Sequence, residues 1–375
     1  MKPSKARIRT KQWLYSLEPP VVAAVCLLAA LVSDLTVFAW LTPLFIFVAL
    51  PIMDRRSPHD KMDPDRVIEQ LRARRGYYQA IVRAYVPLQW LVTALALACF
   101  ATTQEGIWMT VGLVLSVGIV NGIAIAPAHE LNHQRGAINR LFALLGVTLT
   151  FYGQFLVEHN RGHHVRVATP QDPASARLGE SFWEFALRSV FMGLVSACRF
   201  ELSDWWRSPK LATVLNSKLL QAWLVSAVVF GSVLLWLGLG LFLFLVAQAV
   251  VGILLLEVVN YIEHYGLKRE LIDGRYEPCT PAHSWSSNKL VTNIGLYNLQ
   301  RHADHHANPT KPYEQLKHYK DSPQHPTGYA AMIVLALVPS LWFRTMDPRV
   351  LAMYGGDPAK ANVQPRKLKK YMKTA

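Results

Sequence analysis

The sequence predicts an all-α integral membrane protein with six transmembrane helices and a cytoplasmic-side histidine cluster. Hydrophobic residues make up 52% of the 375 residues and charged residues only 17%, a composition too apolar for a soluble protein of this length. Nine of the 13 histidines fall in four short clusters, each near the end of a long apolar segment. Together these observations predict a metal site built at a membrane face.

Six apolar segments are candidates for membrane spans, since a bilayer core requires roughly 20 apolar residues per helix. Five are clear, at residues 35–53, 78–101, 107–128, 219–237 and 239–259, and a sixth, at 15–33, has a shorter strictly apolar part. The first segment could instead be a secretory signal, because basic residues precede it. No clear polar mature domain follows, which favours a span.

The distribution of Lys and Arg predicts the orientation of the spans. Five basic residues precede residue 12 and seven lie in the 54–76 connection, whereas the turns near Asp34, Glu105 and Gly238 contain none. Short cytoplasmic loops carry an excess of Lys and Arg. Both termini and the 54–76 connection are therefore expected in the cytoplasm.

The chain is expected to form one integral-membrane domain over residues 1–375, with a cytoplasmic cap at about 129–215 and 260–375. The apolar segment 140–157 lies between two histidine clusters. It should therefore dip into the membrane and return to the same side, or pack below the membrane interface. The 15-residue apolar segment 329–343 contains Pro339 and is expected to pack at the interface rather than span. Residues 366–373 are expected to form a mobile basic tail.

The spacing of the histidines predicts metal ligation. Residues four apart on an α-helix are offset by about 40° and share a face, which places His129 beside His133. The same spacing recurs in two further clusters, each with an adjacent pair: His159/His163/His164 and His302/His305/His306. Adjacent residues point about 100° apart, so one metal rarely uses both. The two adjacent pairs therefore favour two metal ions.

Each histidine also has a structural interpretation. His264 alone would more often be an interfacial or satisfied core residue than a ligand. Clustered imidazoles beside apolar spans are costly unless paired or ligated, which favours ligation for the set. Four other histidines lack such partners and are left as surface or supporting residues: His59, His283, His318 and His325.

Iron is the favoured metal. Imidazole suits zinc, copper, iron and nickel, but structural zinc takes four ligands and has no redox chemistry, whereas nine histidines would serve two metals with four or five each. The four cysteines, Cys26, Cys99, Cys198 and Cys279, are widely separated and form no CxxC pair. Neither a disulfide framework nor a thiolate metal site is supported.

Polar residues near the clusters are candidates for supporting the ligands, because metal-bound histidine commonly donates its other N–H to a carboxylate. The candidates are Glu130, Glu158, Glu257, Asn260, Glu263 and Asp304. Some of the carboxylates could be ordinary surface charges. Glu257 lies inside a predicted span, where a carboxyl group is energetically costly and therefore indicates a functional role. Pairing with Arg or Lys from a neighbouring element is the structural alternative.

The formal net charge of +14 is best explained by cytoplasmic loops that face anionic lipid headgroups. An acidic protein partner is a second interpretation. Nothing in the sequence resembles a nucleic-acid-binding fold.

The ordered set of histidine motifs resembles the membrane-bound alkane 1-monooxygenase (alkane ω-hydroxylase) family, in the wider class of histidine-rich di-iron membrane oxygenases and desaturases. The resemblance rests on four strings: NGIAIAPAHELNH (121–133), EHNRGHHVRVATPQDPASARLGES (158–181), NYIEHYG (260–266) and LQRHADHHANP (299–309). It extends over most of the chain.

The resemblance implies two non-haem irons held by nine histidines: His129, His133, His159, His163, His164, His264, His302, His305 and His306. It also implies O2-dependent hydroxylation of the terminal methyl of linear alkanes, with no catalytic side chain assigned beyond these ligands. Electrons in such systems come from NADH through a reductase and rubredoxin. This chain has no four-cysteine rubredoxin motif, so its rubredoxin should be a separate polypeptide.

Three rival functions remain. A fatty-acyl desaturase or hydroxylase would use the same metals, but His-x-x-x-His-His at residues 159–164 differs from the His-x-x-His-His usual in desaturases. A methyl-aromatic or terpene hydroxylase is closer to the alkane hydroxylase pattern, and the sequence excludes it poorly. A metal transporter or sensor is disfavoured, because transporter sites generally lie near the bilayer midplane and these histidines lie beyond the span ends.

Overall fold

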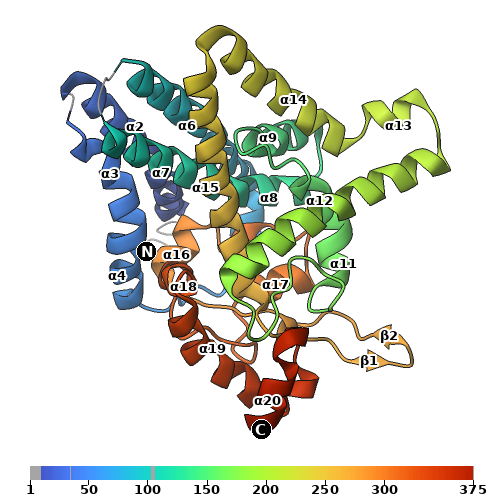
Figure 1. Cartoon of the computed structure of the whole chain (residues 1–375). Helices are drawn as coiled ribbons and strands as arrows, with labels where there is room; N and C mark the ends of the chain where they lie inside the picture. The colour runs from blue at the N-terminus through green and yellow to red at the C-terminus, as the bar shows by residue number, and fades with distance from the viewer. Residues whose placement is uncertain (1–9, 34, 103–105, 375) are drawn as a thin grey trace.

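The computed structural model describes residues 10–33, 35–102 and 106–374 and shows a mostly helical protein (Figure 1). Within these residues the only sheet is a short antiparallel hairpin of β1 (Leu271–Ile272) and β2 (Arg275–Tyr276). The predicted all-α class is confirmed. The basic residues up to Arg9, and Asp34 and Glu105 at two turns, lie outside the described residues, so the predicted orientation stays a prediction.

Six helical segments among the described residues are long and apolar enough to cross a membrane. They are Thr10–Ser33, Val37–Arg56, Arg75–Thr102, Ile107–His133, Lys218–Leu237 and Leu239–His264. Each contains or overlaps one predicted span. The predicted number of membrane helices is therefore confirmed, and the limits of the cytoplasmic cap stay a prediction.

Most helices follow one another after a few residues, with longer connections at 167–181, 265–280 and 316–328. The spans comprise η1 (Trp13–Leu17), α2 (Glu18–Ser33), α3 (Val37–Leu44), η2 (Phe45–Ala49), α4 (Leu50–Arg56), α6 (Arg75–Thr102), α7 (Ile107–Ile123), α8 (Ile125–His133), α14 (Lys218–Ser232), η5 (Val233–Leu237) and α15 (Leu239–His264). Outside the spans lie η3 (Pro64–Val67), α5 (Ile68–Ala73), α9 (Ala137–Thr148), α10 (Phe155–Glu158), η4 (His159–His163), α11 (His164–Arg166), α12 (Phe182–Arg207), α13 (Leu211–Leu215), η6 (Pro281–His283), α16 (Leu290–Gly295), α17 (His302–Ala307), η7 (Tyr313–Gln315), α18 (Tyr329–Ala336), α19 (Pro339–Met353), η8 (Pro358–Lys360), η9 (Pro365–Lys367) and α20 (Leu368–Thr374).

Helices α7 and α15 cross closely. This crossing positions the ends of the fourth and sixth spans, which carry His133 and His264. A Cβ atom on Gly122 would lie 2.9 Å from the carbonyl oxygen of Gly252, so the contact requires small residues, as membrane helix crossings often do. Just before this crossing, the Asn121 amide donates to Gln248 Oε1 at 2.8 Å and to Thr93 Oγ1 at 3.1 Å. These bonds satisfy polar groups that would be costly in an apolar interior.

The segment from α9 to α10 leaves the histidines and returns to them. Helix α9 has 12 residues, which gives a length of about 18 Å, too short to cross a bilayer. The chain reverses after α9, with Phe151 at a positive φ of 52°. The rings of His133 and His159, on either side of the excursion, have centroids 5.2 Å apart. This agrees with the prediction that the segment does not make a single crossing of the membrane.

The C-terminal helices α18, α19 and α20 lie at the end of the molecule opposite the α14–α15 turn (Figure 1). The apolar segment predicted at 329–343 is divided between α18 and α19, with Pro339 at the first position of α19. The prediction of a mobile basic tail is wrong. Tyr371 is buried in α20 and its hydroxyl donates to Asp347 Oδ2 at 2.6 Å, so one aromatic residue within the basic run fixes the tail to α19.

Candidate metal centre

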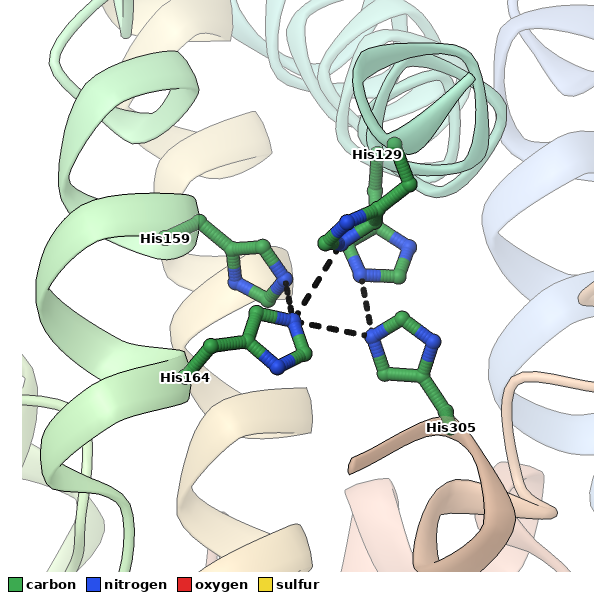
Figure 2. Close-up of side chains that lie close together, drawn as sticks. His129, His159, His164 and His305 are labelled. Carbon is green, nitrogen blue, oxygen red and sulfur yellow. Dashed lines mark hydrogen bonds between the residues drawn. The ribbon is translucent and has the colours of Figure 1, made fainter. Parts of the chain in front are cut away.

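Five histidines form one group where four elements meet. His129 and His133 come from α8, His159 and His164 from η4 and α11, and His305 from α17. His164 Nε2 lies 2.9 Å from His159 Nε2, 3.1 Å from His305 Nε2 and 3.2 Å from His133 Nε2. Figure 2 shows the labelled rings turned toward one another, with His159 and His164 on one ribbon and His129 and His305 on two others.

Four other histidines form a second group. His163 is the last residue of η4, His264 is the last residue of α15, and His302 and His306 lie on α17. His163 Nε2 lies 3.2 Å from His306 Nε2, and His264 Nε2 lies 3.1 Å from His302 Nε2. Within each group all ligand atoms lie within 4.8 Å of one another. All nine predicted histidines are therefore brought together in a set of five and a set of four.

The donor set fits metal ions better than internal hydrogen bonding. A neutral imidazole nitrogen carries at most one proton, so His164 Nε2 cannot make hydrogen bonds to all three of its neighbours by donation. Burial lowers the pKa well below 6.5, and neighbouring imidazoles lower it further, for five members outside the spans: His159, His164, His302, His305 and His306. Neutral, converging imidazoles are the form that binds metal.

Each adjacent pair is divided between the groups, in agreement with the angular argument from the sequence. His163 belongs to the group of four and His164 to the group of five, and His306 and His305 are divided in the same way. The pairing of His159 differs from the prediction. It shares a group with His164, five residues on, and not with His163, four residues on.

A π-helical turn explains this difference. Residues His159–His163 form η4, in which the N–H of His164 reaches the carbonyl of His159. Such a turn brings residues five apart onto one face, and π-turns occur frequently at functional sites. Gly162 is required there, because a Cβ atom at this position would collide with the paired side chains of Glu158 and Arg166.

Two groups accept hydrogen bonds from the second ring nitrogens of the four-histidine group, and a third lies near one of them. Glu263 Oε1 lies 3.2 Å from His302 Nδ1 without forming a hydrogen bond. Asp172 Oδ2 accepts from His163 Nδ1 at 2.8 Å, and the His283 carbonyl accepts from His264 Nδ1 at 3.2 Å. Such contacts fix the tautomer and direct Nε2 toward a metal. Burial raises the pKa of Asp172, but the contacts with His163 and Ser175 outweigh it, so the net pKa is below 3.8.

Asp172 was missed by the sequence analysis, because its only signal is an acid nine residues beyond a histidine. Of the six predicted supporting residues, Glu263 is the one for which the described residues show a close approach to a ligand ring nitrogen. The others have different partners: Gln134 and Tyr313 for Glu130, Arg166 for Glu158, Tyr152 for Glu257, Glu257 for Asn260, and Asn308 and Lys311 for Asp304. A supporting role for these five stays a prediction.

An apolar cavity of about 320 Å³ reaches the histidines. Its walls come from the first, second, fourth and sixth spans together with α16 and α18, and include Ile46, Leu50, Ile123, Leu256 and Ile294. Members of both histidine groups, His129, His159 and His302, are part of its lining. A molecule without polar groups could therefore reach the space beside the metal-binding nitrogens.

Buried histidine groups at the ends of apolar helices define a histidine-rich membrane metalloprotein. Residues 106–336 match the family described as fatty acid desaturase. The chain is 39% identical to an alkane 1-monooxygenase of Acinetobacter baylyi over 98% of this chain and 92% of that protein. It is 40% identical to alkane 1-monooxygenase 2 of Pseudomonas aeruginosa over 85% of each chain.

A more distant match is the hydroxylase component of a xylene/toluene monooxygenase from Pseudomonas putida, which is 27% identical over 62% of each chain. The chain belongs to the alkane 1-monooxygenase family, an oxidoreductase family within the broader fatty acid desaturase group.

Proposed function

We propose that this protein hydroxylates the terminal methyl group of medium-chain n-alkanes to primary alcohols, with O2 and two non-haem irons held by the nine histidines. The observation that carries the proposal is the apolar cavity that reaches both histidine groups. The relatives named alkane 1-monooxygenase support the same reaction and substrate class.

The fit to iron follows from the ligands and the reaction. Nine converging imidazoles give five ligands to one ion and four to the other, a set that suits several borderline metals. An unactivated C–H bond requires a strong oxidant, which bound iron supplies with O2 and redox-inert zinc does not. The open apolar space at His129 and His302 lets substrate approach without displacing a polar side chain.

The chain's own residues orient the substrate by shape. A linear alkane dissolves in the bilayer and offers no polar handle, so the cavity wall must present only the chain end to the histidines. Each methylene enclosed by residues such as Leu50 and Leu256 contributes about 0.8 kcal/mol by burial. Exclusion of water by the same wall confines the reaction to the enclosed methyl group.

A methyl-aromatic substrate is the second candidate, because one relative is named a xylene/toluene monooxygenase component. The lower identity and coverage of that relative favour alkanes. Competition between octane and xylene, followed by gas chromatography of the alcohols, separates the two. A higher kcat/KM for xylene would reverse the order of preference.

Electrons are proposed to come from a separate rubredoxin and its NADH-dependent reductase. The net charge of +14 suits a small acidic carrier that docks on the face of the membrane where the histidines lie. That face is assigned to the cytoplasm, with both termini on the same side of the bacterial inner membrane, by the distribution of Lys and Arg.

Metal analysis combined with octane turnover tests the proposal. The purified protein, supplied with rubredoxin, reductase and NADH, should contain about two irons per chain and form 1-octanol as the main product. His163→Ala and His305→Ala remove one ligand from each group and should abolish tight iron binding and activity. Full activity in either variant, or metal uptake without O2 consumption, would contradict it.

A further inference from the structure

A second, smaller cavity lies beside the histidines and differs from the first in its polar lining. Its volume is about 30 Å³, and it adjoins the apolar cavity at Phe155, His159 and Asn260. The remaining lining includes the side chains of Tyr152, Glu158, Ser189 and Glu257, together with His163. It has room for about two water molecules.

Two buried carboxyl groups line this cavity, and the hydroxyl groups of Ser189 and Ser196 approach Glu257 and Glu158 respectively. Glu257 Oε1 accepts from the Tyr152 hydroxyl at 2.8 Å, and Glu158 Oε1 accepts from Arg166 at 2.6 Å. Their Oε2 atoms have no well-directed hydrogen bond among the described residues, although Glu257 is only 1% exposed and Glu158 7%. Buried carboxylate oxygens without such a bond are costly, so water in the cavity is the natural partner for both.

The proposed reaction needs protons beside the histidines. Conversion of an alkane and O2 to an alcohol and water consumes two electrons, which the reduced carrier supplies, and two protons. The large cavity is lined mostly by apolar side chains, which are poor conductors of protons. The small cavity has a larger share of polar side chains in its lining, touches a histidine of each group through His159 and His163, and contains a carboxyl group on a membrane-spanning helix.

We propose that this polar cavity is a water-binding site through which protons reach the histidine centre, with Glu257 as the relay residue. This inference rests on the proposed hydroxylation. Glu158 at this cavity forms an ion pair with Arg166, whose side chain is 28% exposed, so the cavity lies one ion pair away from solvent. Glu257 passes a proton from one cavity water to the next and regains it from the water on its outer side, with no net change in the carboxyl group.

Glu257→Gln tests the relay, because it keeps the shape of the side chain and the acceptor for Tyr152. The variant should keep two irons and bind octane, lose about 100-fold in kcat, a typical contribution of a positioned acid or base, and release more peroxide per electron consumed. Its solvent deuterium isotope effect should exceed that of the wild type. Glu257→Asp should restore part of the rate.

Ser226→Ala is the matched control, because it removes a buried hydroxyl that donates to the Thr148 carbonyl and lines neither cavity. It should retain the turnover and the wild-type isotope effect. Full kcat and wild-type peroxide release in Glu257→Gln would overturn the relay. Absence of alcohol from the wild type would instead overturn the proposed hydroxylation.

A measurement without turnover tests the water site separately. A high-resolution structure of the zinc-loaded protein should show ordered water within about 3 Å of Glu257 Oε2, and the same water should persist in Ser226→Ala. A dry cavity would overturn the inference, whatever the activity of the iron-loaded enzyme.

Discussion

At the residue scale, the group of four histidines depends on side chains that are not ligands. Asp172 is fully buried, accepts from His163 Nδ1 and is itself held by the Ser175 hydroxyl at 2.6 Å. Without this acceptor the imidazole can rotate or adopt the other tautomer, which directs a protonated nitrogen at the metal.

Asp172→Asn should therefore weaken iron binding by about 10–100-fold, mainly in the group of four. Iron retained during titration with a chelator measures the loss. Ser175→Ala removes only the outer contact and should cause a smaller loss. Equal retention of iron by Asp172→Asn and wild type would show that His163 is oriented by packing alone.

Glu314 makes the stability of the protein dependent on pH. Burial raises the pKa of this carboxyl group to about 7, although Gln315 and Arg75 lower it in part. The pKa of this carboxyl group is higher in the folded state than in the unfolded state, where it is about 4.5. Its contribution to the free energy of unfolding is therefore fully present at pH values below 4.5. That favourable contribution is lost as the pH rises toward 7, by about 3 kcal/mol in all.

Glu314→Gln should consequently be more stable than wild type at pH 8 and similar at pH 5. Thermal unfolding in detergent at the two values measures this difference. Asp273→Asn, at the turn of the exposed β1–β2 hairpin, is the control and should change neither value. A stability difference that is the same at both pH values would argue against ionisation as the cause.

At the element scale, the position of each histidine is set by the type of helix that carries it. Regular α-helical geometry correctly predicts that His129 pairs with His133 and His302 with His306. It fails at His159, because the π-turn η4 adds one residue to the turn. A sequence pattern does not reveal such a turn, since the Glu158–Arg166 contact that accompanies it depends on the fold.

The π-turn also relates the two motif spacings compared in the sequence. His-x-x-x-His-His with a π-turn pairs the first and last histidines, and so does His-x-x-His-His on a regular α-helix, where residues four apart share a face. Deletion of Arg161 should therefore let the turn revert to α-helix and keep more iron than insertion of Ala after Arg161. Iron per chain measures both, and equal loss in the two variants would contradict this account.

At the scale of the whole molecule, six apolar segments and the composition were enough to predict the membrane helices. The apolar cavity was not predictable in its details, because residues such as Ile46 and Leu256 look the same in sequence whether they face lipid, core or a substrate space. The position of Asp172 depended likewise on a loop whose path the sequence does not show.

The net charge of the molecule bears on how the electron carrier finds it. A cation-rich face steers an acidic carrier and raises the rate of encounter by 10-fold or more at low salt, and the screening length falls to about 10 Å at 0.1 M salt. Exposed cations such as Arg66 and Arg72, 85% and 64% accessible and each paired with an exposed carboxylate three residues earlier, lie in the connection assigned to the same face as the histidines.

The apparent KM for reduced rubredoxin should therefore rise several-fold between about 20 and 200 mM salt, while kcat at saturating carrier stays constant, because salt weakens encounter and leaves the buried histidine centre unscreened. Steady-state octane turnover at both salt concentrations measures the effect. Arg66→Gln combined with Arg72→Gln should reduce the salt dependence. A KM that is insensitive to salt would mean that the carrier docks through apolar contacts instead of charge.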